Sequence, residues 1–271
     1  MNWTRRVGAV PLLALTAVVA PMLTDASAQA ATERARSSVS SPPESPPPGA
    51  LLSAFAGNQL KYCSLICPHI IDGLVQVPIA LVRAPGVFVD ARARTGSTDR
   101  ATGIAAASVT GPANSAMAGI IGDDLDLVLP RAQNALEVAV VEMIAVADKA
   151  RAGAPPATVG TAFNTARGKT LEALNAPIVP NPPDIATPHT AAQAAALDAI
   201  DVGSAILFQA PEQVMAGATD AADIAARRLA ATGDVNSARA TGMAHLNDTV
   251  AQAGEAIRRS ITNHHVPQGD G

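Results

Sequence analysis

The sequence predicts an all-α protein: an alanine-rich antiparallel helix bundle or helical hairpins after a signal peptide and a disordered Pro/Ser-rich tether. Three observations support this. Apolar residues recur at helical spacing, alanine dominates these stretches, and proline or glycine clusters separate them. The expected parts are a signal peptide, linker, N-terminal helical region with the cysteine pair, proline-rich connector, C-terminal helical region and disordered tail, at residues 1–28, 29–50, 51–176, 177–189, 190–262 and 263–271.

The N-terminus has the composition of an export signal. Arg5 and Arg6 precede an apolar run over residues 7–23, and Ala26-Ser27-Ala28 offers a small-residue cleavage site. The serine- and proline-rich linker that follows lacks the apolar bulk needed to offset ordering entropy. We expect a secreted or cell-envelope-associated protein, and retention of the apolar run as an anchor is the open alternative.

Charge and aromatic content disfavour two classes of ligand. Loss of Arg5, Arg6 and Asp25 with the signal changes the formal charge from −4 to −5, so no basic footprint for nucleic acid is present. Bases and sugars stack on aromatic rings. Few rings remain after signal removal: Phe55, Tyr62, Phe88, Phe163 and Phe208. We therefore expect no nucleic-acid binding, and carbohydrate binding is unlikely.

The clearest helix is predicted over residues 131–152. Its apolar residues recur at helical spacing, and Glu137 is expected to reach solvent. Gly153 and the prolines after it supply the stop, and a second helix is predicted over residues 157–175. The inward positions of the first helix are expected to be Leu136, Val140, Met143, Ile144 and Ala147.

Further helix signals follow the proline-rich connector. Thr190 and Gln193 have the form of a capping box, and Pro211 suits the first turn of the next helix. Asp234 is expected to cap a final helix that reaches about Ile261. Its predicted apolar stripe is Val235, Ala238, Leu246, Val250, Ala253, Ile257 and Ile261.

Alanine at so many inward positions has an energetic consequence. Small side chains let helix axes approach closely, but each one buries little area, at about 25 cal/mol per Å² of apolar surface. Long helices must compensate for this. We therefore expect long antiparallel helix pairs and a face for self-association or for an envelope protein or lipid partner.

The most apolar part of the mature chain lies between Tyr62 and Val89. Asp72, Pro78 and Arg83 argue against a membrane-spanning helix. The favoured interpretation is a buried helix, and a helix lying in a membrane surface is the alternative. Two proline-bounded runs, "VPIALV" and "PGVFV", are candidates for strand fragments. The candidate interaction face consists of Ile70, Ile71, Leu74, Val75, Ile79 and Val82.

Cys63 and Cys67 are the only cysteines in the chain. In an exported protein two cysteines tend to pair, so we expect an internal disulfide. Pro68 biases Cys67 away from helical angles and suits a first helical turn. The pair is therefore expected in a turn that leads into the apolar helix. The alternative is a thiol or metal site of Cys63, Cys67 and His69.

The order Cys63, Cys67, Pro68 resembles the Cys-x-x-x-Cys-Pro signature of Sco-type copper-assembly proteins. The match covers only those positions. The resemblance implies a thioredoxin-like fold and a distant histidine ligand, for which His189 and His245 are the candidates. This sequence departs from the family in the surrounding segments, because a proline-rich tether precedes the motif and helices follow it.

No hydrolase motif or phosphate-binding glycine loop is present in the mature sequence. Asp123, Asp124 and Asp126 precede the strongest helix, where capping or solvated charge explains them. His264 and His265 fall in the expected tail. Alanine is in excess and nearly all basic residues are arginine, which is typical of high-GC bacterial coding. We expect no cofactor and an exported non-enzymatic helical protein of the bacterial cell envelope that acts through helix–helix or membrane-surface interaction. Copper or thiol handling is the alternative function, and an active site assembled from separate helices stays open.

Overall fold

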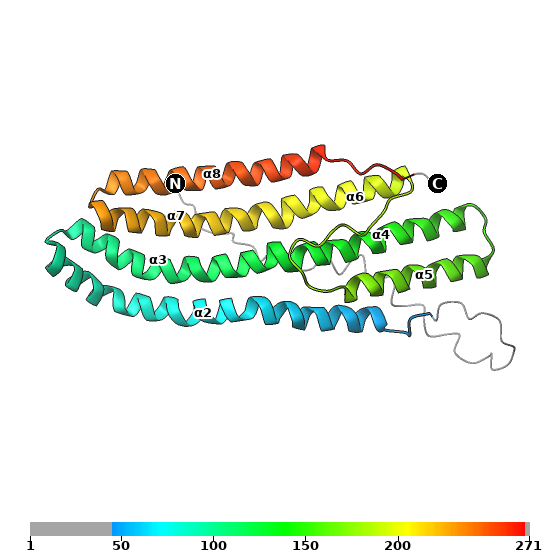
Figure 1. The fold of residues 1–271 in the computed structure, drawn as a ribbon, viewed down its shortest axis with the longest axis horizontal. Helices are drawn as coiled ribbons and strands as arrows, with labels where there is room; N and C mark the ends of the chain where they lie inside the picture. The colour runs from blue at the N-terminus through cyan, green and yellow to red at the C-terminus, as the bar shows by residue number, and fades with distance from the viewer. Residues whose placement is uncertain (1–44, 269–271) are drawn as a thin grey trace, which may run out of the picture.

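The computed structural model describes residues 45–268, so the expected signal peptide and most of the expected linker lie outside the described residues. The described chain is helical and contains no strand, which confirms the all-α prediction (Figure 1). Its elements are α2 (Ala50–Thr95), α3 (Thr98–Asp123), π-helix η2 (Asp124–Val128), α4 (Leu129–Arg151), α5 (Pro156–Asn175), α6 (Ala191–Ser204), π-helix η3 (Ala205–Gln209), α7 (Ala210–Thr232) and α8 (Val235–Thr262).

Two long helical runs continue through a π-helical segment without a break, and we call each uninterrupted run a rod. One runs through α3, η2 and α4, and the other through α6, η3 and α7. Each π segment ends just before a proline, Pro130 or Pro211, in the first turn of the following α-helix. A proline lacks the N–H for the helical ladder, and its ring collides with the carbonyl four residues earlier. We attribute the widened turns to accommodation of these prolines.

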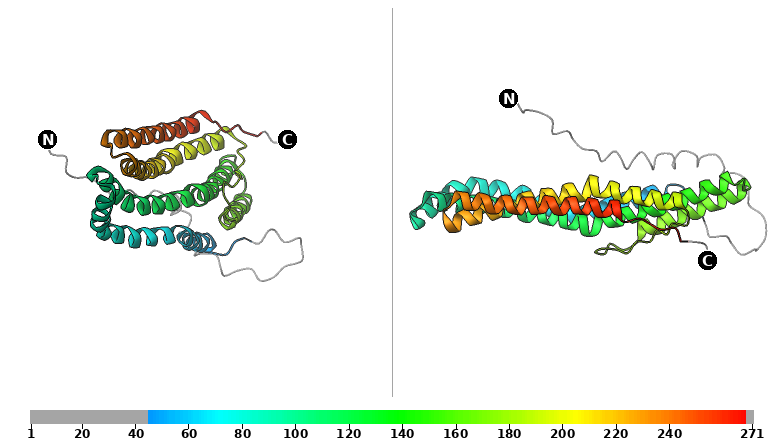
Figure 2. Two further views of the ribbon diagram at one scale, coloured as in Figure 1. Left: turned by 60° about the vertical axis from the view of Figure 1, so that its left-hand side comes forward. Right: turned by 90° about the horizontal axis from the view of Figure 1, so that it is seen from above.

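The long helices lie side by side in a layer. α2 packs on α3, α3 on α7 and α7 on α8, while α5, α4 and α6 continue the layer toward the other end. The view from above shows how thin this arrangement is (Figure 2). α2 forms one edge, because it packs on α3 along its C-terminal part, from about His69 onward, and on α5 near its start. A layer of this kind gives its edge helix one covered side and one open side.

Small residues bring the helices of the layer together. A Cβ added at Gly103 in α3 would lie 2.2 Å from the backbone nitrogen of Ala230 in α7. A Cβ added at Gly242 in α8 would lie 2.7 Å from the carbonyl oxygen of Ala221. Alanine also supplies most of the buried apolar residues. The close approach expected from the alanine content is therefore present.

The helix ends match several sequence signals. Thr190 and Gln193 form the predicted capping box at the start of α6. Asp234 accepts the backbone N–H groups of Asn236 and Ser237 at the start of α8. Gly233 ends α7 in the left-handed conformation at φ 70°, which glycine adopts at little cost.

The connector and the C-terminal segment are held against the helices. The backbone N–H of Asn181 donates to the Asp126 carbonyl, and Asn134 Nδ2 donates to the Pro183 carbonyl. The backbone N–H of Gln268 donates to the Pro188 carbonyl over 2.8 Å. Residues 263–268 are the part of the expected disordered tail that the structure describes. They lie against the connector, because the backbone N–H of Gln268 bonds to it.

Several local expectations were wrong. The turn expected at Cys63–Cys67 and both candidate strand fragments lie inside α2, whose three internal prolines are all exposed. These prolines lie on the open side of α2, where each carbonyl that loses its helical donor can accept a hydrogen bond from water. Asp123, Asp124 and Asp126 do not cap a helix start, because the helix runs through η2 without a break, but Asp126 is exposed, as the solvated-charge interpretation expects.

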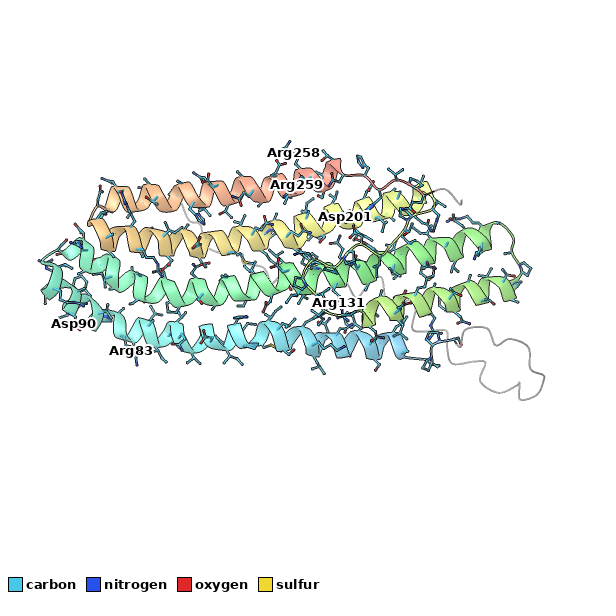
Figure 3. The ribbon with its side chains drawn as sticks, in the orientation of Figure 1. Arg83, Asp90, Arg131, Asp201, Arg258 and Arg259 are labelled. Carbon is cyan, nitrogen blue, oxygen red and sulfur yellow. A yellow bond between two sulfur atoms is a disulfide. The ribbon has the colours of Figure 1, made fainter. Side chains whose placement is uncertain are left out.

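Arg131 joins three helices in the middle of the layer (Figure 3). It is 3 % exposed, and its Nη1 donates to the Tyr62 hydroxyl of α2 over 3.0 Å. Its Nε and Nη2 donate to the carbonyls of Ala176 and Leu174 at the end of α5. Asn58 of α2 also donates to the Leu174 carbonyl. The cation therefore satisfies C-terminal carbonyls of α5, where positive charge is favoured, and fixes α2 to α4.

The close approach of α3 and α7 is testable with two glycine variants. We expect Gly103→Ala to lower the free energy of unfolding by about 1–3 kcal/mol, because the methyl group meets backbone that must move. The matched variant Gly160→Ala, in an open position of α5, should raise it by about 0.5–1 kcal/mol. Urea unfolding followed by circular dichroism measures both, and equal stabilisation of the two variants would contradict the close contact.

Candidate interaction surface

The open side of α2 carries an apolar strip that the helix layer does not cover. We call this strip the α2 stripe. Its members are exposed by 39 % or more: Leu60, Ile70, Ile71, Leu74, Val75, Ile79, Leu81, Val82 and Val89. All six residues of the predicted interaction face belong to it. Val82 is 83 % exposed and Leu74 70 %, so the favoured interpretation of a buried helix was wrong for this side.

The inward side of α2 holds its closest contacts with neighbouring helices. A Cβ added at Gly73 would lie 2.9 Å from the Ala116 Cβ of α3, and Ala91 is fully buried. Tyr62 and Asn58 reach the Arg131 junction. The three buried residues of α2 are Asn58, Tyr62 and Ala91, and bulky apolar residues on this side, such as Leu65 and Val87, are only half-buried. The large apolar side chains that are most exposed lie on the other side.

Charges lie beside the α2 stripe and not along its centre. At 3.6 residues per turn, Lys61, Asp72 and Arg83 fall on one flank of the helix. Asp72 and Arg83 are both exposed. Figure 3 labels Arg83 and Asp90 on α2 at the edge of the layer. The stripe runs from Leu60 to Val89, which corresponds to about 43 Å at 1.5 Å per residue. A strip of this length can accommodate a second helix along its whole length.

The cysteine pair lies at the N-terminal end of this stripe. The Cys63 and Cys67 sulfur atoms are 2.03 Å apart, at disulfide distance, and the Cα atoms are 5.0 Å apart. Pro68 cannot donate to the Ser64 carbonyl, so the helical ladder loses one bond at the turn that the sulfur bridge spans. The disulfide therefore closes a single turn of α2 at the point where proline weakens it.

The structure does not bring His69 to the two sulfur atoms. His69 Nε2 lies 3.1 Å from Asp123 Oδ2 of α3, on the inward side of α2. His245 pairs with Asp220 over 2.8 Å, and His189 Nδ1 lies 3.3 Å from the Gln268 carbonyl. Over residues 45–268, no group of three or more His, Cys, Asp or Glu side chains is placed to hold a metal ion. This geometry does not favour the copper alternative.

Sequence reasoning missed a buried polar cluster beneath the C-terminal segment. Glu137 is 2 % exposed and not solvent-facing as expected, and Gln133 Nε2 donates to its Oε1 over 2.8 Å. The same Gln133 nitrogen donates to Asp201 Oδ1, whose other oxygen lies 2.9 Å from His265 Nε2. Burial, opposed by the Gln133 hydrogen bond, raises the pKa of Glu137 to about 7. A glutamate in a periodic helix gives no local sign of this environment.

A second pair of carboxyl groups joins the two π-containing rods. Asp124, at the start of η2, faces Glu212, in the first turn of α7. Burial and the neighbouring Asp124 charge raise the pKa of Glu212 to about 8, and burial raises the pKa of Asp124. Two carboxyl groups this close favour a form in which one holds a proton. Neither residue stands in a sequence motif that indicates such a pair.

Two open hollows lie elsewhere on the molecule. One, of about 400 Å³, lies between α4 and α5 and is lined by Glu142, Lys149, Lys169 and threonine hydroxyls. The other, of about 330 Å³, includes Asp201, Gln209 and Arg259. Neither is lined by Glu137, Asp124 or Glu212. The carboxyl groups with raised pKa are thus part of helix packing and not of these hollows.

Comparison with protein-family models, curated proteins and solved structures finds no match for this chain. The rods α2, α3–α4 and α6–α7 are long and apolar enough to cross a membrane by length and composition. Of these, α2 has its most apolar window entirely unburied. The α2 stripe is therefore the extended apolar surface that most needs a partner.

The raised pKa of Glu137 predicts that the free energy of unfolding depends on pH. Because the folded state holds this proton more tightly than the unfolded state, the stabilisation is complete below about pH 4.5 and is lost as the pH rises through about 7. We expect Glu137→Gln to match the wild type at pH 5 and to exceed its free energy of unfolding at pH 8. Urea unfolding across this range measures the difference.

Glu172→Gln is the matched control for this variant, because Glu172 is an exposed carboxyl on α5. It should leave the pH dependence of unfolding unchanged. A Glu137→Gln variant whose stability follows the wild-type pH profile from pH 5 to pH 8 would show that Glu137 titrates normally.

Proposed function

We infer that this is an exported protein of the bacterial cell envelope that acts through its surface and not through turnover. Its α2 stripe is the docking element, and helix–helix association is the mode of binding. The single observation behind this function is the stripe itself: a helix of 46 residues with large apolar side chains on its open side and three buried residues.

The free-energy cost of exposing this apolar strip to water supports the proposal that a partner covers it. Covering a large apolar side chain contributes about 1.5–3 kcal/mol. The α2 stripe presents nine such side chains on one side of a single helix, whereas single exposed apolar residues need no explanation. The flank of the stripe is polar, as the rim of a protein interface is. A surface with an apolar centre and a charged edge suits association.

Export is supported by the sequence alone, through the arginine pair, the apolar run and the small-residue site in residues 1–28. A lipid surface is the second candidate partner for the same stripe. The observation that favours it is the length and apolar composition of α2, which suffice to cross a membrane. Envelope location is compatible with both partners.

The proposed role of the stripe is tested by a triple variant, Ile71→Ser, Leu74→Ser and Val82→Ser. The full chain is studied by sedimentation velocity and by flotation with phosphatidylcholine–phosphatidylglycerol vesicles. We expect the wild type to self-associate or to float, and the triple variant to lose that behaviour by at least about 100-fold in affinity, because three large apolar contacts are removed.

A second triple variant on α8, with serine at Val235, Met243 and Val250, removes comparable exposed apolar side chains away from the stripe. It should behave as the wild type does. A wild-type chain that is monomeric and indifferent to vesicles would overturn the proposed function. Equal loss in the α8 variant would remove the stripe as its cause.

A further inference from the structure

We propose that the partner of the α2 stripe is the α2 stripe of a second copy of this chain, paired antiparallel about a two-fold axis between Val77 and Pro78. This pairing rests on the proposed docking role of the stripe and names its occupant. It follows from the position of α2 at the edge of the layer (Figure 1) and from the spacing of its charged residues along the helix.

Charge complementarity fixes the register. Asp72 and Arg83 are 11 residues apart, which is about three helical turns, so both lie on one flank of α2. In an antiparallel pair related by a two-fold axis, like flanks lie side by side. An axis midway between the two residues places Asp72 of each copy opposite Arg83 of the other. One register thus forms two opposite-charge pairs.

The same register matches the apolar side chains. It places Leu74, 70 % exposed, opposite Leu81, 56 % exposed, on both sides of the axis. The disulfide turn of one copy lies opposite the C-terminal end of the other stripe. Lys61 falls opposite Arg94, and Asp90, one turn before Arg94, offsets this like-charge contact. The longest apolar line of α2 is covered along its whole length.

The mixed signs on the flank favour a second copy over an anionic membrane. Between residues 61 and 94 this flank holds three basic residues, Lys61, Arg83 and Arg94, and two acidic residues, Asp72 and Asp90. A helix that lies on an anionic lipid surface carries a predominantly basic polar face. A flank of mixed sign, in which Asp72 can face Arg83, is complementary to its own antiparallel copy.

The pairing limits the assembly to a dimer. A two-fold contact uses the same surface on both copies, so it closes at the dimer and does not propagate. The opposite edge of the long-helix layer is α8, whose outer residues differ from those of α2. The dimer would therefore double the width of the layer around a central pair of α2 helices.

Charge-reversal variants of the full chain test the register. Asp72→Arg alone and Arg83→Asp alone each turn two attractive pairs into two repulsive ones. We expect the dimer dissociation constant, measured by sedimentation equilibrium, to rise about tenfold or more in each. The double variant Asp72→Arg/Arg83→Asp restores opposite charges and should return to within about threefold of the wild type. Asp248→Arg, an exposed position on α8, is the control.

The outcomes separate this inference from the proposed function. A wild-type dimer that both single reversals weaken and the double variant restores supports the antiparallel pairing. A dimer indifferent to the reversals, or one not restored in the double variant, overturns it. A monomer that floats with vesicles through the α2 stripe overturns the pairing while the docking role stands. A monomer that binds no vesicles overturns both.

Discussion

Close contact between helix backbones through glycine and alanine is the constraint from which the rest of this structure follows. At Gly103 and Gly242 a single added methyl group would meet the backbone of the neighbouring helix. Where two helices are this close, large side chains have no room between them. At the α2–α3 contact the same close approach occurs at Gly73, beside Ala116, and the strip of α2 that resembles a core helix in sequence lies on the open side of the layer.

Packing by small residues also leaves little apolar area between the helices, so specific polar contacts hold the elements together. Arg131 satisfies carbonyls at the end of α5 and meets Tyr62 of α2. Glu137 and Asp201 share Gln133 beneath the C-terminal segment. Each of these groups would be costly without its partners, because a buried donor or acceptor left unpaired loses its hydration without compensation. These polar contacts define which helices pack against each other and in which register along their axes.

The prolines inside the long helices occur in more than one setting, and Pro112 lies half-buried within α3 without a π turn beside it. Pro130 and Pro211 follow π turns inside the two long rods, where a widened turn absorbs the missing hydrogen bond. Pro68, Pro78 and Pro85 lie on the open side of α2, where no neighbour is displaced. The protein thus keeps long uninterrupted rods despite prolines that would otherwise end them. The length of the rods in turn compensates for the small area buried per turn.

The sequence by itself determined the helical class, the capping box at Thr190, the cap at Asp234 and the apolar identity of the interaction face. These depend on local spacing and on bonds within a few residues. The tertiary structure alone decided that Cys63 and Cys67 lie inside a helix, that Glu137 is buried and that the stripe faces outward. A helix with apolar residues all round has no preferred inward side until a neighbour approaches it, and here steric fit selected the side lined by Gly73 and Ala91.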